Sequence, residues 1–412
     1  MAVLVEVTRR HREARAAVAG AYLVQGLCFA AVLTQVPALK QKFGFTDGEL
    51  ALILLAVPVV AGGGSLLAGL LAPRLGSRPV LRVAGLGVCA AMVGIGLAGS
   101  RAALIAAVTL LGLVLGAVDA TMNMQGVAVQ RWYGRSILAS FHGVWSLAGI
   151  AGALATAAAD RLDLALPVAL GVVAAVGAAI ALTVGPFLLP MAQERSAISA
   201  ARGRSGAEPE VKRPEPGGTA PDRLAAPGIP WRPIVLIGVA VMVMYIAESA
   251  TSNWSAVYLR DELHAGRGVP ALGLAAYLTC QVAGRLRADR VVQRFGAART
   301  VAAGGLVGMA GMALVAVAPT PWLGIVGFAI VGAGLCVVVP LSFTTAGTLD
   351  PTGSGVAIAR VNLFNYAGFV VGAALIGIVA EAAGRRWAFA VPAGLVVLVV
   401  MLARSFQMRA AR

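Results

Sequence analysis

The chain has 412 residues, of which 59% are hydrophobic and only 12% are charged. A soluble domain is nearer one quarter charged, so this composition excludes a water-exposed surface over most of the molecule. The net charge of +15 does not indicate nucleic-acid binding, because the basic residues are scattered between apolar runs.

Twelve apolar runs predict twelve membrane-spanning helices, since about 20 apolar residues in a helix cross the hydrocarbon core. The runs are too long and too uniformly apolar to be the strands of a barrel. We place the spans at residues 17–38, 48–71, 79–99, 102–127, 137–159, 165–189, 233–257, 268–287, 298–318, 322–345, 356–380 and 386–404. The expected fold class is therefore an all-α membrane protein.

The distribution of Lys and Arg predicts the orientation in the membrane. With the N-terminus inside, 25 of the 33 basic residues fall on the cytoplasmic side. Basic residues favour that side of a membrane. We expect a multi-pass protein of a bacterial inner membrane with both termini in the cytoplasm.

One long polar stretch, residues 190–232, divides the chain. It carries Ser, Gly, Pro, Glu and Arg with almost no aliphatic run, a composition that predicts a flexible cytoplasmic linker. The expected domains are an N-terminal six-helix bundle over residues 1–189 and a C-terminal six-helix bundle over residues 233–412.

The two halves share patterns at a nearly constant offset. Gly76 and Gly85 return 220 residues later as Gly296 and Gly305. The five residues from Trp145 match the five from Phe364 at an offset of 219. Two matches at nearly one offset predict a duplicated six-helix unit, with the bundles facing each other across a central cavity.

Two acidic residues, Asp119 and Glu248, lie well inside predicted spans. A charge at the bilayer centre costs at least about 2.5 kcal/mol, so both are candidates for proton coupling. Asn123 lies one helical turn after Asp119 and shares its face. Candidate substrate-binding residues are Gln25, Gln35, Asn123, His142, Trp145, Tyr245, Asn253, Gln281, Asn362, Asn365 and Tyr366. For the amides, simple packing between helices is the alternative.

The segments after the second and eighth spans resemble the loop signature of the major facilitator superfamily, G-x-x-x-D-R-x-G-R-R. In the first copy Pro73 stands where the family has its acid, whereas the second copy carries Asp289 and Arg290. A carboxylate there can pair with an arginine or a helix N-terminus and hold one side closed. Candidate gating residues are Asp289, Arg290, Arg294, Arg74 and Arg78. For the last two, membrane anchoring is an equal alternative.

Within that superfamily the chain resembles the fucose-permease-like group and its relatives of unassigned substrate. The resemblance rests on residues 119–126 of the fourth span, on residues 253–260, and on Phe141 and His142. It implies twelve helices in the family fold and a proton-coupling role for Asp119. The fucose permease also has an acid in its first helix, and no acid occurs here between Ala17 and Pro37.

We expect a secondary transporter that moves a small polar solute, such as a sugar, with protons by alternating access. Proton-driven efflux of a drug or metabolite is the alternative, and a non-transporting sensor or scaffold is an alternative of another class. The sequence contains no Walker motif, no H-E-x-x-H motif and no metal-ligand spacing, so we expect no enzyme, cofactor or metal. The expected partners are the solute, protons and the lipid bilayer, without nucleic acid, and the expected functional unit is a monomer.

Overall fold

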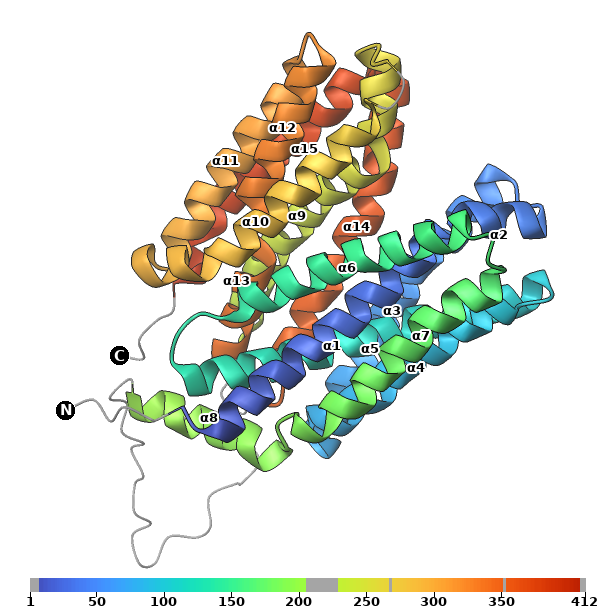
Figure 1. Ribbon diagram of the computed structural model, residues 1–412. Coiled ribbons are helices and arrows are strands. Elements are labelled where there is room, and N and C mark those ends of the chain that lie inside the picture. The colour runs from blue at the N-terminus through green and yellow to red at the C-terminus, as the bar shows by residue number, and fades with distance from the viewer. Residues whose placement is uncertain (1–6, 205–228, 267–268, 351–352, 408–412) are drawn as a thin grey trace, which may run out of the picture.

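The computed structural model describes residues 7–204, 229–266, 269–350 and 353–407, which are nearly all helical and contain no strand. Figure 1 shows two bundles that meet at the end of the molecule where both termini lie and diverge toward the opposite end. We call these ends the termini end and the far end.

The first bundle contains the helices before residue 190. They are α1 (Arg9–Thr34), α2 (Val36–Phe43), α3 (Asp47–Leu75), α4 (Ser77–Leu97), α5 (Arg101–Tyr133), α6 (Leu138–Arg161), α7 (Leu166–Val184) and the 3-10 turn η1 (Gly185–Phe187). The first predicted span divides into α1 and α2 at Gln35, because Pro37 has no backbone N–H to donate to the Leu33 carbonyl and so cannot continue the hydrogen bonding of α1.

The second bundle contains the helices after residue 230. They are α9 (Trp231–Val257), the π-helical turn η2 (Tyr258–Glu262), α10 (Ala271–Phe295), α11 (Ala297–Val317), α12 (Pro321–Leu335), α13 (Val338–Thr348), α14 (Val356–Ala383), α15 (Arg385–Leu402) and η3 (Ala403–Phe406). Helices α12 and α13 form one span that is interrupted at Cys336. Pro340, four residues later, cannot donate a helical hydrogen bond to the Cys336 carbonyl.

Among the described residues, eleven helical segments are long and apolar enough to cross a membrane. The remaining predicted span is α10, which also carries five charged residues toward its C-terminal end: Arg285, Arg287, Asp289, Arg290 and Arg294. It still packs between α12 of its own bundle and α6 of the first bundle. The structure therefore has the twelve-helix architecture that the apolar runs predicted.

The segment predicted as a flexible linker begins with a helix, α8 (Met191–Arg204). Its Glu194 accepts hydrogen bonds from Ser77 Oγ at 2.7 Å and Gln125 Nε2 at 2.6 Å, which hold α8 against the first bundle. The prediction is thus corrected for residues 191–204, where polar side chains bind the bundle. Residues 205–228 lie outside the described residues, and the division into domains at 189 and 233 stays a prediction.

Helix contacts repeat between the bundles at an offset of 220 residues. A Cβ on Gly112 would lie 3.0 Å from the carbonyl oxygen of Val57, and a Cβ on Gly332 would overlap that of Tyr277. Both glycines therefore allow a close approach of corresponding helices, α5 to α3 and α12 to α10. These matched contacts agree with a duplicated six-helix unit.

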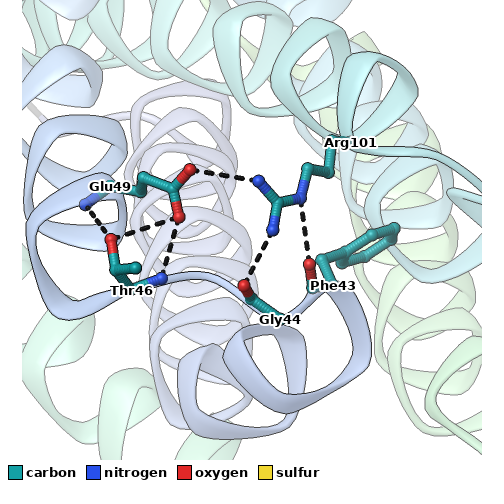
Figure 2. Close-up of polar contacts among 5 residues, drawn as sticks. All are labelled: Phe43, Gly44, Thr46, Glu49 and Arg101. Atoms are coloured by element: carbon teal, nitrogen blue, oxygen red, sulfur yellow. Dashed lines mark hydrogen bonds and ion pairs between the residues drawn. The ribbon is translucent and has the colours of Figure 1, made fainter.

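At the far end, Arg101 ties the α2–α3 turn to the start of α5 (Figure 2). Its guanidinium donates to the carbonyls of Phe43 and Gly44 at 3.0 and 2.7 Å and to Glu49 at 3.0 Å. Glu49 also accepts from the Thr46 amide at 2.8 Å and so closes a capping box on α3. The Thr46 amide, with Arg101, lowers the pKa of Glu49 below its ordinary value.

Candidate functional site

The hydrogen bonds between the bundles, among pairs of described residues, lie from mid-span to the termini end. The first bundle contributes residues of α3, α5, α6 and the loop between α5 and α6. The second bundle contributes residues of α10, α13 and α14. The pairs are Ser65 with Ala359 and Asn362, Asp119 with Tyr366, Gln130 with Thr344, Arg131 with Gly347, Ser136 with Asp289 and Gln293, Ala139 and Ser140 with Asp289, and Ser146 with Arg285. The molecule is therefore closed at its termini end.

Asp119 lies on the inner face of α5 and is bonded from both bundles. Its two carboxylate oxygens accept hydrogen bonds from Gln25 of α1 and from the Tyr366 hydroxyl of α14. Asn123 shares the same face, donates to the Asp119 carbonyl at 2.8 Å and accepts from the Tyr22 hydroxyl at 2.7 Å. We find no ion pair to Asp119 among the described residues, so all its partners are neutral.

Glu248 of α9 lies near a group of polar residues on α10. Tyr277 and Gln281 are within side-chain hydrogen-bonding reach of it, and Arg285 is within electrostatic range. Gln281 donates to the Tyr277 hydroxyl at 2.7 Å. One Glu248 oxygen, Oε2, is buried without a hydrogen-bond partner. Among the described residues, the partners of this acid therefore all belong to its own bundle, and one of its oxygens keeps free acceptor capacity.

Arg285 is a further candidate residue, which the sequence alone does not single out because it stands among the basic residues of the cytoplasmic side. It is 3% exposed, and its Nη1 donates across the bundle interface to Ser146 Oγ at 2.6 Å. Its Nε has no hydrogen-bond partner. Arg285 follows Gln281 by four residues and therefore shares its face of α10, and this spacing is the sequence signal that could identify it as a candidate.

Several buried polar atoms around this interface lack hydrogen-bond partners in the described ranges of the chain. They are Gln25 Oε1, His142 Nε2, Glu248 Oε2, Arg285 Nε and Asn365 Oδ1. Tyr245 connects the group, since it lies within electrostatic range of Asp119, Glu248 and Arg285. An unpaired buried polar atom costs about 1–3 kcal/mol, so this concentration marks a site that a polar ligand can stabilise.

Aromatic rings border the site on the first bundle. The His142 ring stacks on Phe343 of the second bundle with centroids 6.1 Å apart and meets Tyr22 edge-on at 5.1 Å. Trp145, one turn further along α6, is half-buried and lies 6.2 Å from Phe29. These contacts place the His142 ring, whose Nε2 is one of the unpartnered atoms, between a ring of each bundle.

Three further predicted binding residues, Asn362, Gln35 and Asn253, lie at other places in the fold. Asn362 donates to Ser65 Oγ at 3.2 Å and accepts from Asn365 at 3.1 Å, so it contributes to contact between the bundles. Gln35 is buried at the α1–α2 junction, ten residues or about 15 Å along the helix from Gln25. Asn253 is exposed toward the far end of α9. The structure does not bring these last two to the Asp119 group.

Asp289 lies at the N-terminus of α6, one of the two positions expected for a latch. Its carboxylate accepts from Ser136 Oγ at 2.8 Å and from the amides of Ala139 and Ser140 at 3.3 and 2.9 Å. Free amides at a helix N-terminus favour a negative charge. The acid therefore joins α10 to α6 at the termini end.

The arginines of the loop motif take no part in this contact. Arg74, Arg290 and Arg294 are exposed, and Arg78 donates to Pro186 within its own bundle at 3.1 Å. None of the four bonds the opposite bundle among the described residues.

The register of the repeat also corrects the reading of the two loop copies. At the 220-residue offset, Asp289 corresponds to Gly69, and Pro73 corresponds to Gln293. A Cβ on Gly69 would lie 2.9 Å from the Ala359 side chain, and Ala359 is the counterpart of Ala139. The same helix contact is therefore apolar in one half and is made by a hydrogen-bonded carboxylate in the other.

Comparison with known proteins gives a consistent result. The family model of the Major Facilitator Superfamily matches residues 236–411. An uncharacterised MFS-type transporter of Yersinia pestis is 30% identical over 389 residues, covering 93% of this chain and 94% of the relative. An uncharacterised transporter of Sinorhizobium fredii, y4wD, is 28% identical over 386 residues, covering 94% and 96%.

Solved structures share the fold at low sequence identity. FucP in an outward conformation has a TM-score of 0.75 and 16% identity, covering 97% of this chain and 100% of FucP. The proton:xylose symporter XylE has a TM-score of 0.75 and 10% identity, with 95% and 94% coverage. The human organic anion transporter MFSD10 has a TM-score of 0.73 and 18% identity, with 95% and 99% coverage.

Proposed function

Since the chain belongs to the major facilitator superfamily and is a secondary transporter of the membrane, we propose that it moves a small polar solute together with protons. We place it in a bacterial inner membrane with the termini end in the cytoplasm, in keeping with the excess of basic residues there. The expected unit is a monomer, because each chain contains both bundles and the site between them.

The hydrogen bond from Tyr366 to Asp119 carries the proposal of proton coupling, because it joins the two bundles. An ionised carboxylate accepts bonds from both Gln25 and Tyr366, whereas a protonated one carries a hydrogen on one oxygen and accepts less well. Protonation from the far end therefore weakens a bond that holds the termini end closed. Alternating access then carries the proton and the solute to the other side.

The mixture of unpartnered atoms favours a hydroxylated solute such as a sugar. Arg285 Nε can only donate a hydrogen bond. Oε2 of an ionised Glu248 and the amide oxygen Oδ1 of Asn365 can only accept one. A hydroxyl group both donates and accepts, so several hydroxyls on one solute can satisfy groups from both bundles. FucP and XylE, which are described as fucose:proton and proton:xylose symporters, support this choice of solute class.

A thermal-shift screen of the purified protein against sugars and sugar alcohols identifies the solute, because a ligand that binds the folded state raises apparent stability. Proteoliposomes then test the coupling. A proton gradient should drive uptake of the identified solute above its external concentration, and an uncoupler should abolish that accumulation. Equal accumulation with and without the gradient contradicts proton coupling.

An organic anion is a second candidate solute, favoured by the buried and partly unpartnered guanidinium of Arg285. The fold shared with the organic anion transporter MFSD10 is compatible with it. Including carboxylic acids in the same screen separates the two classes. An anionic ligand should lose binding in Arg285→Gln much more than in Glu248→Gln, and a neutral sugar should depend on both residues. Inside-out and right-side-out vesicles distinguish efflux from uptake.

A further inference from the structure

A cavity of about 750 Å³ lies at the termini end, away from the Asp119 group. It is formed by α1, the α5–α6 connection, α6 and a single residue of α10, Leu286. Three arginines border it: Arg12, Arg15 and Arg135. The solute pathway proposed above does not use any of them.

Within the described part of the chain, the three guanidinium groups have no anionic partner. None of them forms a hydrogen bond or ion pair with another described residue, and Glu13, the acid nearest to them on α1, is paired with Arg9 at 2.8 Å. The Arg15 guanidinium lies over the Tyr133 ring, 5.3 Å from its centroid, which fixes its direction. Three like charges around one cavity create a potential that attracts an anion.

The wall of the cavity is apolar. It includes Ala16, Ala19, Phe141, Val144 and Leu286, of which Leu286 is 46% exposed. A free inorganic anion gains nothing from such a wall, whereas a phospholipid presents a charged headgroup and an acyl chain together. Arg15 lies less than two turns into α1, the depth at which basic and aromatic side chains meet the membrane interface.

We propose that this cavity binds an anionic phospholipid, with its phosphate among the three arginines and an acyl chain along Val144 and Leu286. The site is completed by both bundles, because Leu286 belongs to α10 and the remaining wall belongs to the first bundle. Ser140 lines the cavity and donates its amide to the latch residue Asp289 at 2.9 Å. A lipid bound here therefore stabilises the contact of α6 with α10 and the closed termini end.

Native mass spectrometry of the full-length protein in detergent tests this site, with phosphatidylglycerol and phosphatidylcholine of the same acyl chains as probes. The wild-type protein should retain phosphatidylglycerol in preference to phosphatidylcholine. The triple variant R12Q/R15Q/R135Q should bind phosphatidylglycerol at least about tenfold more weakly, since each basic residue contributes to headgroup attraction. The charge-preserving variant R12K/R15K/R135K should recover most of that binding.

A matched variant, R232Q/R299Q/R404Q, removes three exposed arginines from the termini end of the second bundle. It should keep the affinity for phosphatidylglycerol. Equal loss in the two glutamine triple variants overturns the proposal, because binding then depends on overall charge. Equal retention of the two lipids also overturns it. Displacement of phosphatidylglycerol by millimolar inorganic phosphate would assign the cavity to a free anion and overturn the lipid assignment.

Discussion

The two acids inside the membrane are bonded in different ways. Asp119 has both carboxylate oxygens occupied by neutral donors, one from each bundle, whereas Glu248 keeps an unpartnered oxygen near an arginine of its own bundle. An acid bonded across the interface therefore responds to separation of the bundles. An acid bonded within one bundle moves with that bundle, so it can bind a ligand throughout the separation of the two bundles.

The two acids are not symmetry counterparts in the duplicated fold. At the 220-residue offset, Asp119 corresponds to Val339 and Glu248 corresponds to Cys28. The same is true of the latch, where Asp289 corresponds to Gly69. The repeated backbone therefore supplies the framework, and unique side chains on it supply the proposed functions.

The sharpest test of this comparison is the pair Asp119→Asn and Glu248→Gln. Asp119→Asn removes the carboxyl that we propose takes up the proton, so uptake driven by a proton gradient should fall by about two orders of magnitude or more while solute exchange continues. Glu248→Gln should instead weaken solute binding and impair exchange as well. Counterflow and gradient-driven uptake are measured in the same proteoliposomes.

If Asp119→Asn accumulates the solute as the wild type does, Asp119 is not the proton carrier and Glu248 becomes the candidate. If the two variants lose the same activities in the same proportion, the division of roles between the bundles is wrong. Immunodetection of each variant in the liposomes controls for the amount of inserted protein.

The framework itself is tested by the corresponding glycines Gly152 and Gly372. A Cβ on Gly152 would overlap the Leu27 carbonyl oxygen, and a Cβ on Gly372 would lie 2.8 Å from Ile246 Cα. Each change to alanine should therefore destabilise the protein by about 1–3 kcal/mol, because the helices must move apart. Thermal unfolding in detergent measures the loss.

Gly171→Ala is the control, since no atom lies within 4 Å of its added Cβ and alanine favours the helix. Its unfolding temperature should be unchanged or higher. A loss of stability at only one of the two corresponding glycines would show that the bundles do not share this helix contact.

The latch asymmetry predicts a smaller effect for Asp289→Asn. The substitution removes a charge at the α6 N-terminus, an interaction that contributes about 0.3–1 kcal/mol and up to about 2 when partly buried. The fraction of molecules open at the termini end should rise by several-fold. Spin labels at the corresponding exposed residues Leu75 and Phe295, which end α3 and α10, report this as longer distances.

Arg299→Gln provides the control for the latch, because Arg299 is exposed and forms no hydrogen bond with the first bundle among the described residues. Its distance distribution should match that of the wild type. An unchanged distribution in Asp289→Asn would mean that the carboxylate caps α6 without holding the bundles together.

The smallest predicted effect is a pH dependence with opposite signs at the two ends. The hydrogen bond from the Thr46 amide, aided by Arg101, lowers the pKa of Glu49. The contribution of the ionised Glu49 carboxylate to stability is therefore present above about pH 4.5 and is lost as the pH falls through the lowered pKa. Burial raises the pKa of Glu194, because the ionised carboxylate is disfavoured there. Stability should therefore fall as the pH rises from about 4.5 through the raised pKa of Glu194.

Unfolding temperatures measured against pH test this for Glu49→Gln and Glu194→Gln. The difference in unfolding temperature between wild type and Glu49→Gln should narrow on acidification. Glu194→Gln should remove the loss of stability that accompanies deprotonation of Glu194. The Glu49 effect should be slight, because this carboxyl is solvent-exposed. The same pH dependence in both variants would contradict the assigned environments.

Local patterns determined much of the fold. Hydropathy over about 20 residues located the spans, because each span must satisfy its own backbone in lipid. The 220-residue offset predicted the repeat, and helical periodicity placed Asn123 beside Asp119. These features depend on neighbours in the chain, so the sequence by itself sufficed for them.

Only the tertiary structure decided how the bundles meet. The bond of Tyr366 to Asp119 joins residues 247 positions apart, and that of Arg285 to Ser146 joins residues 139 apart. Such pairs depend on the crossing of α14 with α5 and of α10 with α6, which no local pattern encodes. For the same reason the sequence alone does not separate Arg285 from the cytoplasmic charges or predict the packing of α8. Nor does it show that Gln35 and Asn253 lie away from the Asp119 group.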